Sequence, residues 1–338
     1  MGALTTADQV SEIAFGFMGS KALFAALEHG VFSALADGPL EAGDLAARSD
    51  LDTERARTLL TALTGLGLVV PRGPGAYANS PAAEAFLVKG AKYDFGDYLR
   101  LQVGRQMYGL LDQIDAALTG DLPDAATASY AEWFADPEEA RLYSESQHSG
   151  SLGPARQLAK RLDLSAAHHM LDVGGGTGAF AITLCKANPH LTATIVDFPN
   201  VAELGQAYVD KAGLSDRIRY VAGNALESDW PGGQDIVLMS YLLSGVPGET
   251  HAGLIQGAMD KLAPGGMLLI HDFVVRADRT GPKLAALWQL QHTAFTPRAR
   301  SLDAAGLAEA LREAGFADVS VGEMIPEMTM LAEARKPG

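Results

Sequence analysis

The chain has 338 residues, of which 48% are hydrophobic, so it is long enough for two domains with sizeable cores. Its formal net charge of −15 disfavours nucleic acid and anionic membranes as partners. The single cysteine, Cys185, cannot form an internal disulfide, and we expect no bound metal. Because we find no signal peptide and no run of about 18 apolar residues, we expect a cytoplasmic enzyme.

The first hundred residues have the order of a winged helix, which is a helix-turn-helix followed by a β-hairpin. Asp52 caps the last of the helices, and Glu54 lies in its first turn. Prolines and glycines at 71–75 form the hairpin turn. The predicted elements in chain order are helices over 9–35, 40–48 and 53–66 and strands over 68–70 and 76–78.

A winged helix often binds DNA, but the charge of this one argues against it. Residues 1–100 contain eight Lys and Arg against twelve Asp and Glu, and phosphate binding needs a positive surface. The helices around the winged unit are also more apolar than one small core requires. We therefore expect residues 1–100 to form a dimerisation domain and the protein to be a homodimer.

The rest of the chain changes from a helical pattern to an alternation of strands and helices. We expect a helical bridge over 101–164 that contributes to a substrate pocket, and a second domain over 165–338. The alternation predicts a doubly wound, mostly parallel sheet, in which ligands bind at the carboxyl ends of the strands. The predicted strands are 169–173, 192–196, 218–222, 235–239, 267–272, 318–322 and a last one near 327–334.

The glycine-rich segment 171–180 links a buried strand to a helix and predicts a nucleotide-type pocket. About 20 residues further on, Asp197 ends the next strand, where a carboxylate can accept both hydroxyls of a ribose. Two details argue against a dinucleotide. Ala179 stands where the dinucleotide-binding motif has its third glycine, and the Asp172 carboxylate would repel a pyrophosphate. A carboxylate there suits the ammonium and sulfonium of S-adenosyl-L-methionine (SAM).

These motifs together resemble the SAM-dependent small-molecule O-methyltransferases of the plant caffeate and bacterial antibiotic-tailoring type. The resemblance extends over nearly the whole chain and includes 171–178, 197–199, 223–226, 262–266 and 311–316. It implies a Rossmann-like class I SAM methyltransferase domain preceded by an α-helical winged-helix dimerisation domain, with S-adenosyl-L-homocysteine as product. The cofactor-binding residues that it implies are Asp172, Gly174, Gly176, Asp197, Phe198, Asn224, Ala225 and Ser240.

The chain departs from the family pattern after the fourth strand of this domain. The family has a histidine there that acts as general base, whereas this chain has Ser244, and Asp272 matches the acidic partner of that histidine. A serine is not a base near neutral pH. Three interpretations follow: another base such as His251 or His148, a SAM-fold protein or regulator that transfers no methyl group, or a nucleophile without a proton.

A thioether or a tertiary amine fits the third interpretation, because each attacks a methyl group without losing a proton, and aromatic rings would stabilise the cation. The chain also looks similar to the bacterial methylthiohydroxybutyrate S-methyltransferases of dimethylsulfoniopropionate synthesis. The main alternative is O-methylation of a phenolic or polyketide-like metabolite with a displaced base. The residues expected to carry catalysis are Tyr143, Tyr241, His251 and Asp272, and those expected to bind the methyl acceptor are Gln147, His148, Ser244, Trp288, His292, Phe295 and Arg298.

Overall fold

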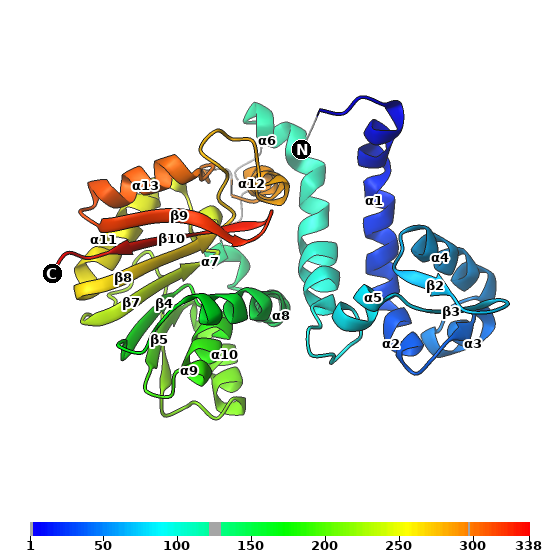
Figure 1. The fold of residues 1–338 in the computed structure, drawn as a ribbon, viewed down its shortest axis with the longest axis horizontal. Coiled ribbons are helices and arrows are strands. Elements are labelled where there is room, and N and C mark those ends of the chain that lie inside the picture. The colour runs from blue at the N-terminus through cyan, green and yellow to red at the C-terminus, as the bar shows by residue number, and fades with distance from the viewer. Residues whose placement is uncertain (1–2, 122–129, 297) are drawn as a thin grey trace. The chain divides into compact units, whose positions relative to one another are not determined.

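The structure, a computed structural model, describes residues 3–121, 130–296 and 298–338. The chain divides into two units, Met1–Tyr108 and Gly109–Gly338, and each is described by itself (Figure 1). The division falls eight residues beyond the boundary expected at residue 100. Most of the segment expected as a helical bridge therefore belongs to the second unit.

The first unit begins with two helices where the apolar pattern predicted one. The helices are α1 (Ala7–Glu28) and α2 (Val31–Ala36). Between them Gly30 adopts a left-handed φ of 65°, which interrupts the helix, so the prediction of a continuous helix over 9–35 is wrong. At the start of α1, Thr6 and Gln9 form a capping box that satisfies free backbone N–H groups.

The remainder of this unit confirms the winged helix. Its three strands form an antiparallel sheet in the order β1-β3-β2. Asp52 accepts hydrogen bonds from the N–H groups of Glu54 and Arg55, both at 3.1 Å, as predicted for an N-cap. The elements are β1 (Leu40–Glu41), α3 (Ala42–Ser49), α4 (Thr53–Gly65), β2 (Val69–Pro71), β3 (Ala76–Asn79), α5 (Pro81–Phe86) and the π-helix η1 (Tyr98–Met107).

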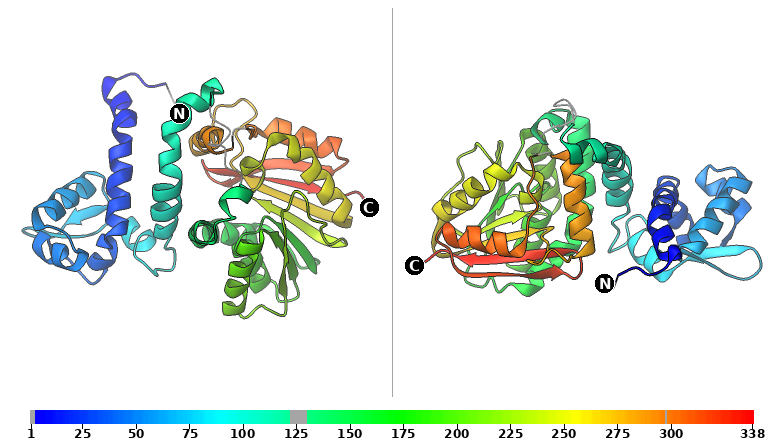
Figure 2. Two further views of the ribbon diagram at one scale, coloured as in Figure 1. Left: turned by 180° about the vertical axis from the view of Figure 1, so that it is seen from behind. Right: turned by 90° about the horizontal axis from the view of Figure 1, so that it is seen from above.

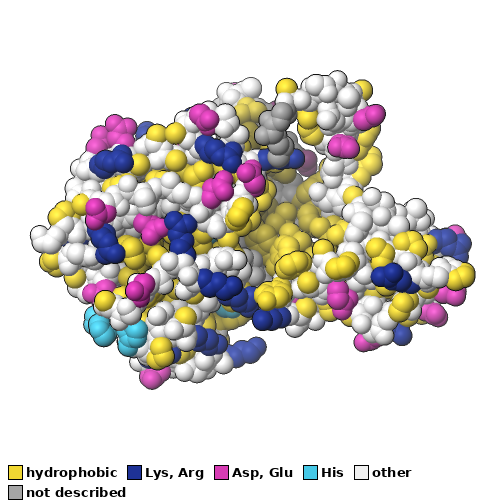
Figure 3. All heavy atoms as spheres, in the orientation of Figure 1, with side chains coloured by type: hydrophobic (Ala, Val, Ile, Leu, Met, Phe, Trp, Pro, Cys, Tyr) yellow, Lys and Arg dark blue, Asp and Glu magenta, His cyan; other side chains and the backbone are white. Residues whose placement is uncertain are grey.

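Helix α1 leaves much of its apolar surface exposed. Val10, Ile13 and Phe17 are 57%, 66% and 52% exposed, and apolar side chains show at the surface of the first unit (Figure 3). Contrary to the sequence expectation, α1 is long and apolar enough to cross a membrane, by length and composition alone. An apolar face of this kind also marks a protein interface.

The second unit is built on a seven-stranded sheet in the order β6-β5-β4-β7-β8-β10-β9. The first five strands in this order are parallel, and β10 is antiparallel to both of its neighbours. All seven predicted strands are present, to within a few residues. They are β4 (His169–Val173), β5 (Thr192–Asp197), β6 (Ile218–Ala222), β7 (Gln234–Ser240), β8 (Leu262–Asp272), β9 (Ala317–Ile325) and β10 (Thr329–Arg335).

Helices cover both faces of this sheet (Figures 1 and 2). One core joins alternate strand residues to α11 and α13, and the other joins the intervening residues to α8, α9 and α10. The helices of this unit, with η2 at the division between the units, are η2 (Tyr108–Gln113), α6 (Ile114–Thr119), α7 (Tyr130–Trp133), α8 (Pro137–Arg161), α9 (Ala179–Ala187), α10 (Pro199–Lys211), η4 (Leu243–Gly245), η5 (Gly248–Thr250), α11 (His251–Lys261), α12 (Lys283–Phe295) and α13 (Ala304–Glu313).

Two details of the second unit bear on the sequence expectations. Strand β8 begins at Leu262, five residues before the predicted start at residue 267, and its pairing with β7 shifts register between Gln234 and Ile236. Cys185 lies in α9 and is fully buried, and burial raises the pKa of its thiol to about 11. It is therefore a core residue. Among the described residues, no group of three or more His, Cys, Asp and Glu could hold a metal ion.

Candidate active site

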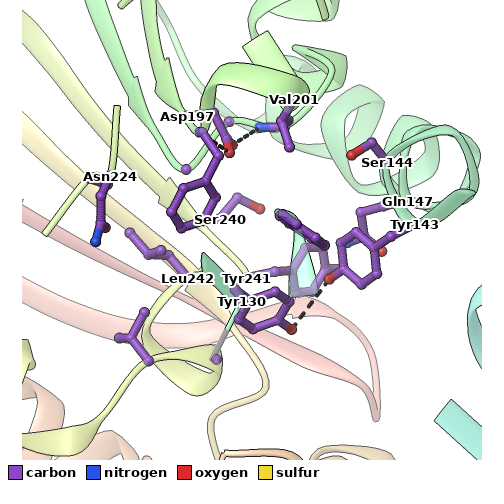
Figure 4. Close-up of a pocket in the computed structure, with 18 of the residues that line it drawn as sticks. Tyr130, Tyr143, Ser144, Gln147, Asp197, Val201, Asn224, Ser240, Tyr241 and Leu242 are labelled. Carbon is purple, nitrogen blue, oxygen red and sulfur yellow. Dashed lines mark hydrogen bonds between the residues drawn. The ribbon is translucent and has the colours of Figure 1, made fainter. Parts of the chain in front are cut away.

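A cavity of about 680 Å³ opens at the carboxyl ends of the central strands (Figure 4). Asp172 of β4, Asp197 of β5 and Ser240 of β7 line it. Strand β4 pairs with β5 on one side and with β7 on the other, so the chain reverses its direction of winding at this point. Open α/β sheets bind their ligands at such a point.

The glycine-rich turn forms the floor of the cavity and is held from both sides. The N–H of Gly174 donates to Val196 O at 2.8 Å, and the Tyr220 hydroxyl donates to Gly176 O at 3.0 Å. Gly175 has the least room, since a Cβ there would lie 2.6 Å from Asp172 Cγ and 2.8 Å from Ile195 Cγ2. The turn is therefore packed closely against the Asp172 carboxylate.

Asp172 presents a buried carboxylate without a hydrogen-bond partner. Its residue is 1% exposed, and neither carboxylate oxygen has a hydrogen-bond partner among the described residues. Burial, assisted by the nearby charge of Asp197 and opposed by the backbone N–H of Ala181, raises the pKa of Asp172 to about 7. A buried carboxylate without a partner is costly to retain and is suited to a cationic ligand group such as an ammonium.

Asp197 is buried too, but its carboxylate has backbone partners. It accepts hydrogen bonds from the N–H of Gly176 at 2.7 Å and of Phe198 at 2.8 Å. Burial raises its pKa to about 6, although both of these hydrogen bonds favour the charged form. The remaining lone pairs of Asp197 are available to ribose hydroxyls. With the free carboxylate of Asp172 these groups fit SAM, and Asp172, Asp197 and the turn at 174–176 would hold it.

One face of α8 supplies polar groups to the cavity. Residues three and four positions apart share a helix face, and here that face carries Ser144, Gln147, His148 and Ser151. His148 Nδ1 lies 2.7 Å from Thr177 Oγ1, and burial, with the charges of Lys186 and Lys211, lowers the pKa of His148 to about 4. Its imidazole is therefore uncharged at neutral pH.

Aromatic rings form another part of the cavity wall, to which Tyr143 of α8 contributes. The Tyr130 ring lies 4.8 Å from that of Phe295 and 5.8 Å from that of Tyr143, and the two tyrosine hydroxyls are 3.4 Å apart (Figure 4). Phe134 and Phe198 extend this wall. Gly245 makes room for Tyr130, because a Cβ at that position would lie 2.9 Å from the tyrosine ring.

The position of the family's histidine contributes no base to this cavity. Ser244 is buried and does not line it, and its N–H donates to Asp272 Oδ2 at 3.0 Å. His251 also lies outside the described lining, and its Nε2 lies 2.8 Å from Leu243 O. Asp272 thus positions the backbone of η4, and neither its carboxylate nor the His251 imidazole faces the cavity.

Tyr241 lines the cavity in a left-handed backbone conformation with a φ of 57°. Such a conformation is strained for a residue other than glycine and is frequent at functional sites. The Tyr241 ring packs against His271 at 4.6 Å and Phe273 at 5.2 Å. Phe273 in turn stacks on Trp288 at 4.4 Å, so Phe273 connects the rings of Tyr241 and Trp288.

The structure brings together most of the predicted site residues but not all of them. Those that line the cavity are Asp172, Gly174, Gly176, Asp197, Phe198, Asn224, Ala225, Ser240, Tyr143, Tyr241, Gln147, His148, Phe295 and Arg298. Those outside its lining are Ser244, His251, Asp272, Trp288 and His292. His292 is buried near Trp288 and Phe295, and burial lowers its pKa to about 4.

Several lining residues were not predicted. Ser144 and Ser151 could have been found, because they lie on the same helical face as His148. Nothing in the sequence distinguishes Tyr130 or Phe134 from the other aromatic residues of the helical segment. Leu242 covers the glycine turn, with its Cδ1 3.0 Å from where a Cβ of Gly174 would lie, a contact that depends on the turn after β7.

The sheet topology, the glycine turn and the paired acidic strand ends together define a SAM-dependent methyltransferase. The chain belongs to the O-methyltransferase family, because residues 123–317 match its O-methyltransferase domain and residues 11–89 match its dimerisation domain. It is therefore an enzyme with SAM as its cofactor, and its first unit carries a dimerisation domain. These matches confirm the resemblance to the O-methyltransferases that the sequence motifs indicated.

Individual relatives methylate different atoms. The chain is 33% identical to 3-hydroxy-5-methyl-1-naphthoate 3-O-methyltransferase of Streptomyces sahachiroi, over 92% of this chain and 89% of the relative. It is 32% identical to an N,N-dimethyltransferase of Streptomyces rimosus, over 88% and 87%. A solved structure of human N-acetylserotonin methyltransferase in complex with SAM has the same fold, with a TM-score of 0.87, 24% identity and full coverage of both chains.

Proposed function

We propose that this enzyme methylates a planar aromatic small molecule whose nucleophile needs no histidine base. The observation that carries the proposal is the aromatic wall of the cavity, together with the absence of a histidine at the family's base position, where Ser244 is buried outside the lining. The names of the relatives support it, since one acts on a hydroxynaphthoate and another transfers methyl groups to nitrogen.

SAM supplies an electrophilic methyl group when it is bound. The residues of the chain orient the two reactants and exclude water, which lowers the barrier by proximity and alignment. The rings of Tyr130, Tyr143 and Phe295 would hold a flat acceptor by stacking and edge contacts. His148 is the only imidazole among the described lining residues, and its lowered pKa makes it a weak base.

An acceptor can react without a protein base in two ways. A phenol that is acidified by conjugation loses its proton to solvent near neutral pH, and a neutral amine attacks through its lone pair before it loses a proton. Both kinds of acceptor are consistent with relatives that methylate oxygen or nitrogen. The acidity of the acceptor itself, rather than that of a side chain, would then determine the pH dependence.

The thioether acid expected from the sequence also needs no base, but its carboxylate needs a cationic partner. Arg298 is the only Lys or Arg among the lining residues that the structure describes. Its Nη1 already lies 2.7 Å from Glu249 Oε1, and the buried Asp172 and Asp197 would repel a second carboxylate. The aromatic wall therefore favours a ring-bearing acceptor over a small thioether acid.

A series of phenols with graded acidity tests this function. In steady-state assays that follow S-adenosyl-L-homocysteine, the midpoint of the pH profile of kcat/KM should move with the pKa of each phenol. A protein base would instead give one midpoint for all of them. The variant His251→Asn should leave every midpoint unchanged. The proposal would be overturned if all phenols shared one midpoint, or if the pH dependence disappeared in His251→Asn. Faster turnover of methylthio acids than of any phenol or arylamine would overturn it as well.

We also propose that the protein is a cytoplasmic homodimer joined through the exposed face of α1. The single, buried cysteine is compatible with a reducing compartment. Replacing Ile13 and Phe17 by glutamate places charges in the proposed interface, and light scattering should then report the monomer mass. Ala305→Glu on α13 is the matched control and should remain dimeric. A dimer that persists in the double variant would exclude this face.

A further inference from the structure

A chain of hydrogen bonds leads from the cavity wall at β7 through β8 to β10. Ser240 Oγ lies 2.9 Å from His271 Nδ1, and His271 Nε2 lies 2.8 Å from Thr329 Oγ1. Ser240 and His271 are register partners on β7 and β8, which places their side chains on the same face of the sheet. Of the three residues, only Ser240 lines the cavity, while His271 and Thr329 have no exposed surface.

The surroundings of His271 keep its ring in place and uncharged. The rings of Tyr241 and Phe180 pack against it at 4.6 and 5.7 Å, and burial lowers its pKa to about 3. A neutral imidazole has one N–H donor and one acceptor nitrogen. The tautomer of His271 therefore decides whether Ser240 presents its hydroxyl hydrogen or its oxygen lone pairs to the cavity.

Ser240 occupies the border between the two halves of the cavity. Figure 4 shows it between Asp197, on the cofactor side, and the Tyr130–Tyr143 pair, on the aromatic side. A SAM molecule held by Asp172 and Asp197 would have its methyl-bearing sulfonium near this border, because the methyl group would have to reach an acceptor in the aromatic half. Polarised C–H groups of such a cation are weak hydrogen-bond donors to oxygen.

We propose that His271 and Thr329 are positioning residues that fix the Ser240 oxygen as an acceptor facing the methyl-bearing sulfonium of SAM. In this arrangement His271 Nε2–H donates to Thr329 Oγ1, and the Ser240 hydroxyl donates to His271 Nδ1. The lone pairs of Ser240 then face the cavity. The inference rests on the SAM cofactor alone and is independent of which acceptor is methylated.

Calorimetric binding of SAM and of S-adenosyl-L-homocysteine tests the contact, since only SAM carries the methyl sulfonium. Ser240→Ala should weaken SAM binding by about three-fold, as expected for weak hydrogen bonds, and S-adenosyl-L-homocysteine binding by less than about two-fold. His271→Leu and Thr329→Val should act in the same direction. His271→Asn retains a polar group near the Nδ1 position. It should therefore keep much of the preference for SAM over S-adenosyl-L-homocysteine that His271→Leu loses.

A matched control lies elsewhere in the same sheet. His169 Nδ1 contacts Thr192 Oγ1 at 3.1 Å at the amino ends of β4 and β5, and His169→Leu should leave both affinities unchanged. Nitrogen NMR of the intact SAM complex should show His271 protonated at Nε2 and not at Nδ1. Equal losses for the two ligands in Ser240→Ala, or protonation of His271 at Nδ1, would overturn the proposal, whatever the acceptor is.

Discussion

Replacing Asp172 by asparagine should weaken SAM binding by about 30-fold or more, because removing one member of a buried charge pair costs about 2–5 kcal/mol. The same change should raise the melting temperature of the cofactor-free protein. Without a ligand this carboxylate is buried, and neither of its oxygens has a hydrogen-bond partner in the part of the chain that the structure describes, which destabilises the fold. Isothermal titration calorimetry and thermal unfolding of one preparation measure both effects.

The pH dependence follows from the raised pKa of Asp172. In the folded, cofactor-free protein this pKa is about 7, against an ordinary value of 3.8, so the folded state retains a proton that the unfolded state has lost. Stability therefore falls as pH rises from about 4 to about 7, and this slope should be shallower in Asp172→Asn. SAM affinity should rise over the upper part of this range, because a bound cation favours the ionised carboxylate.

The control for this prediction removes a carboxylate of equal charge far from the cavity. Asp163 is exposed and accepts a hydrogen bond from the N–H of Ser165 at 3.0 Å. Asp163→Asn should change SAM affinity by less than about two-fold, as expected for a screened surface charge. If Asp172→Asn bound SAM as tightly as the unaltered protein, the carboxylate would not be the site of the ammonium.

Gly175→Ala should damage both the fold and the cofactor site. The new Cβ would lie 2.6 Å from Asp172 Cγ and 2.8 Å from Ile195 Cγ2, and overpacking of this kind costs about 1–3 kcal/mol. Asp172 must move to relieve it, so SAM affinity should fall by about ten-fold or more, the cost of misplacing a buried charged contact. Urea unfolding measures the first effect and calorimetric titration the second.

Gly213→Ala is the control for Gly175→Ala, because it should lower the stability of the fold without lowering SAM affinity. Gly213 has a φ of 70° with nothing within 4 Å of its missing Cβ, and it lies outside the cavity lining. Alanine there should cost about 1–2 kcal/mol of stability from backbone strain alone. SAM affinity should stay as it is in the unaltered protein. A Gly175→Ala protein that lost stability without losing affinity would show that Asp172 tolerates the displacement.

The parts of the fold that sequence reasoning anticipated are those with strong local patterns. The seven strands are apolar runs separated by helices, and Asp172 and Asp197 are strand-end carboxylates at a characteristic spacing. The break at Gly30 was missed because the apolar period continues across it. The constraint on Gly175 was missed as well, because it comes from the packing of Asp172 and Ile195 and not from the glycine spacing itself.

The errors in the site concern the direction of side chains. His251 and Asp272 were expected at the cavity, but His251 Nε2 contacts Leu243 O and Asp272 accepts a hydrogen bond from the N–H of Ser244, so both side chains contact the backbone of η4 instead. Tyr130 comes into the aromatic wall from a separate helix, where Gly245 leaves room for it. Contacts of this kind depend on tertiary packing, which no short sequence motif encodes.

The burial of Cys185 gives the protein an internal reporter of its own opening. The only thiol of the chain lies in α9, which begins directly after the glycine turn and packs against the central strands. Because the thiol is enclosed and its pKa is raised, a thiol reagent reacts only when this layer opens. The rate of thiol labelling therefore reports, without any engineered probe, how often α9 separates from the central strands.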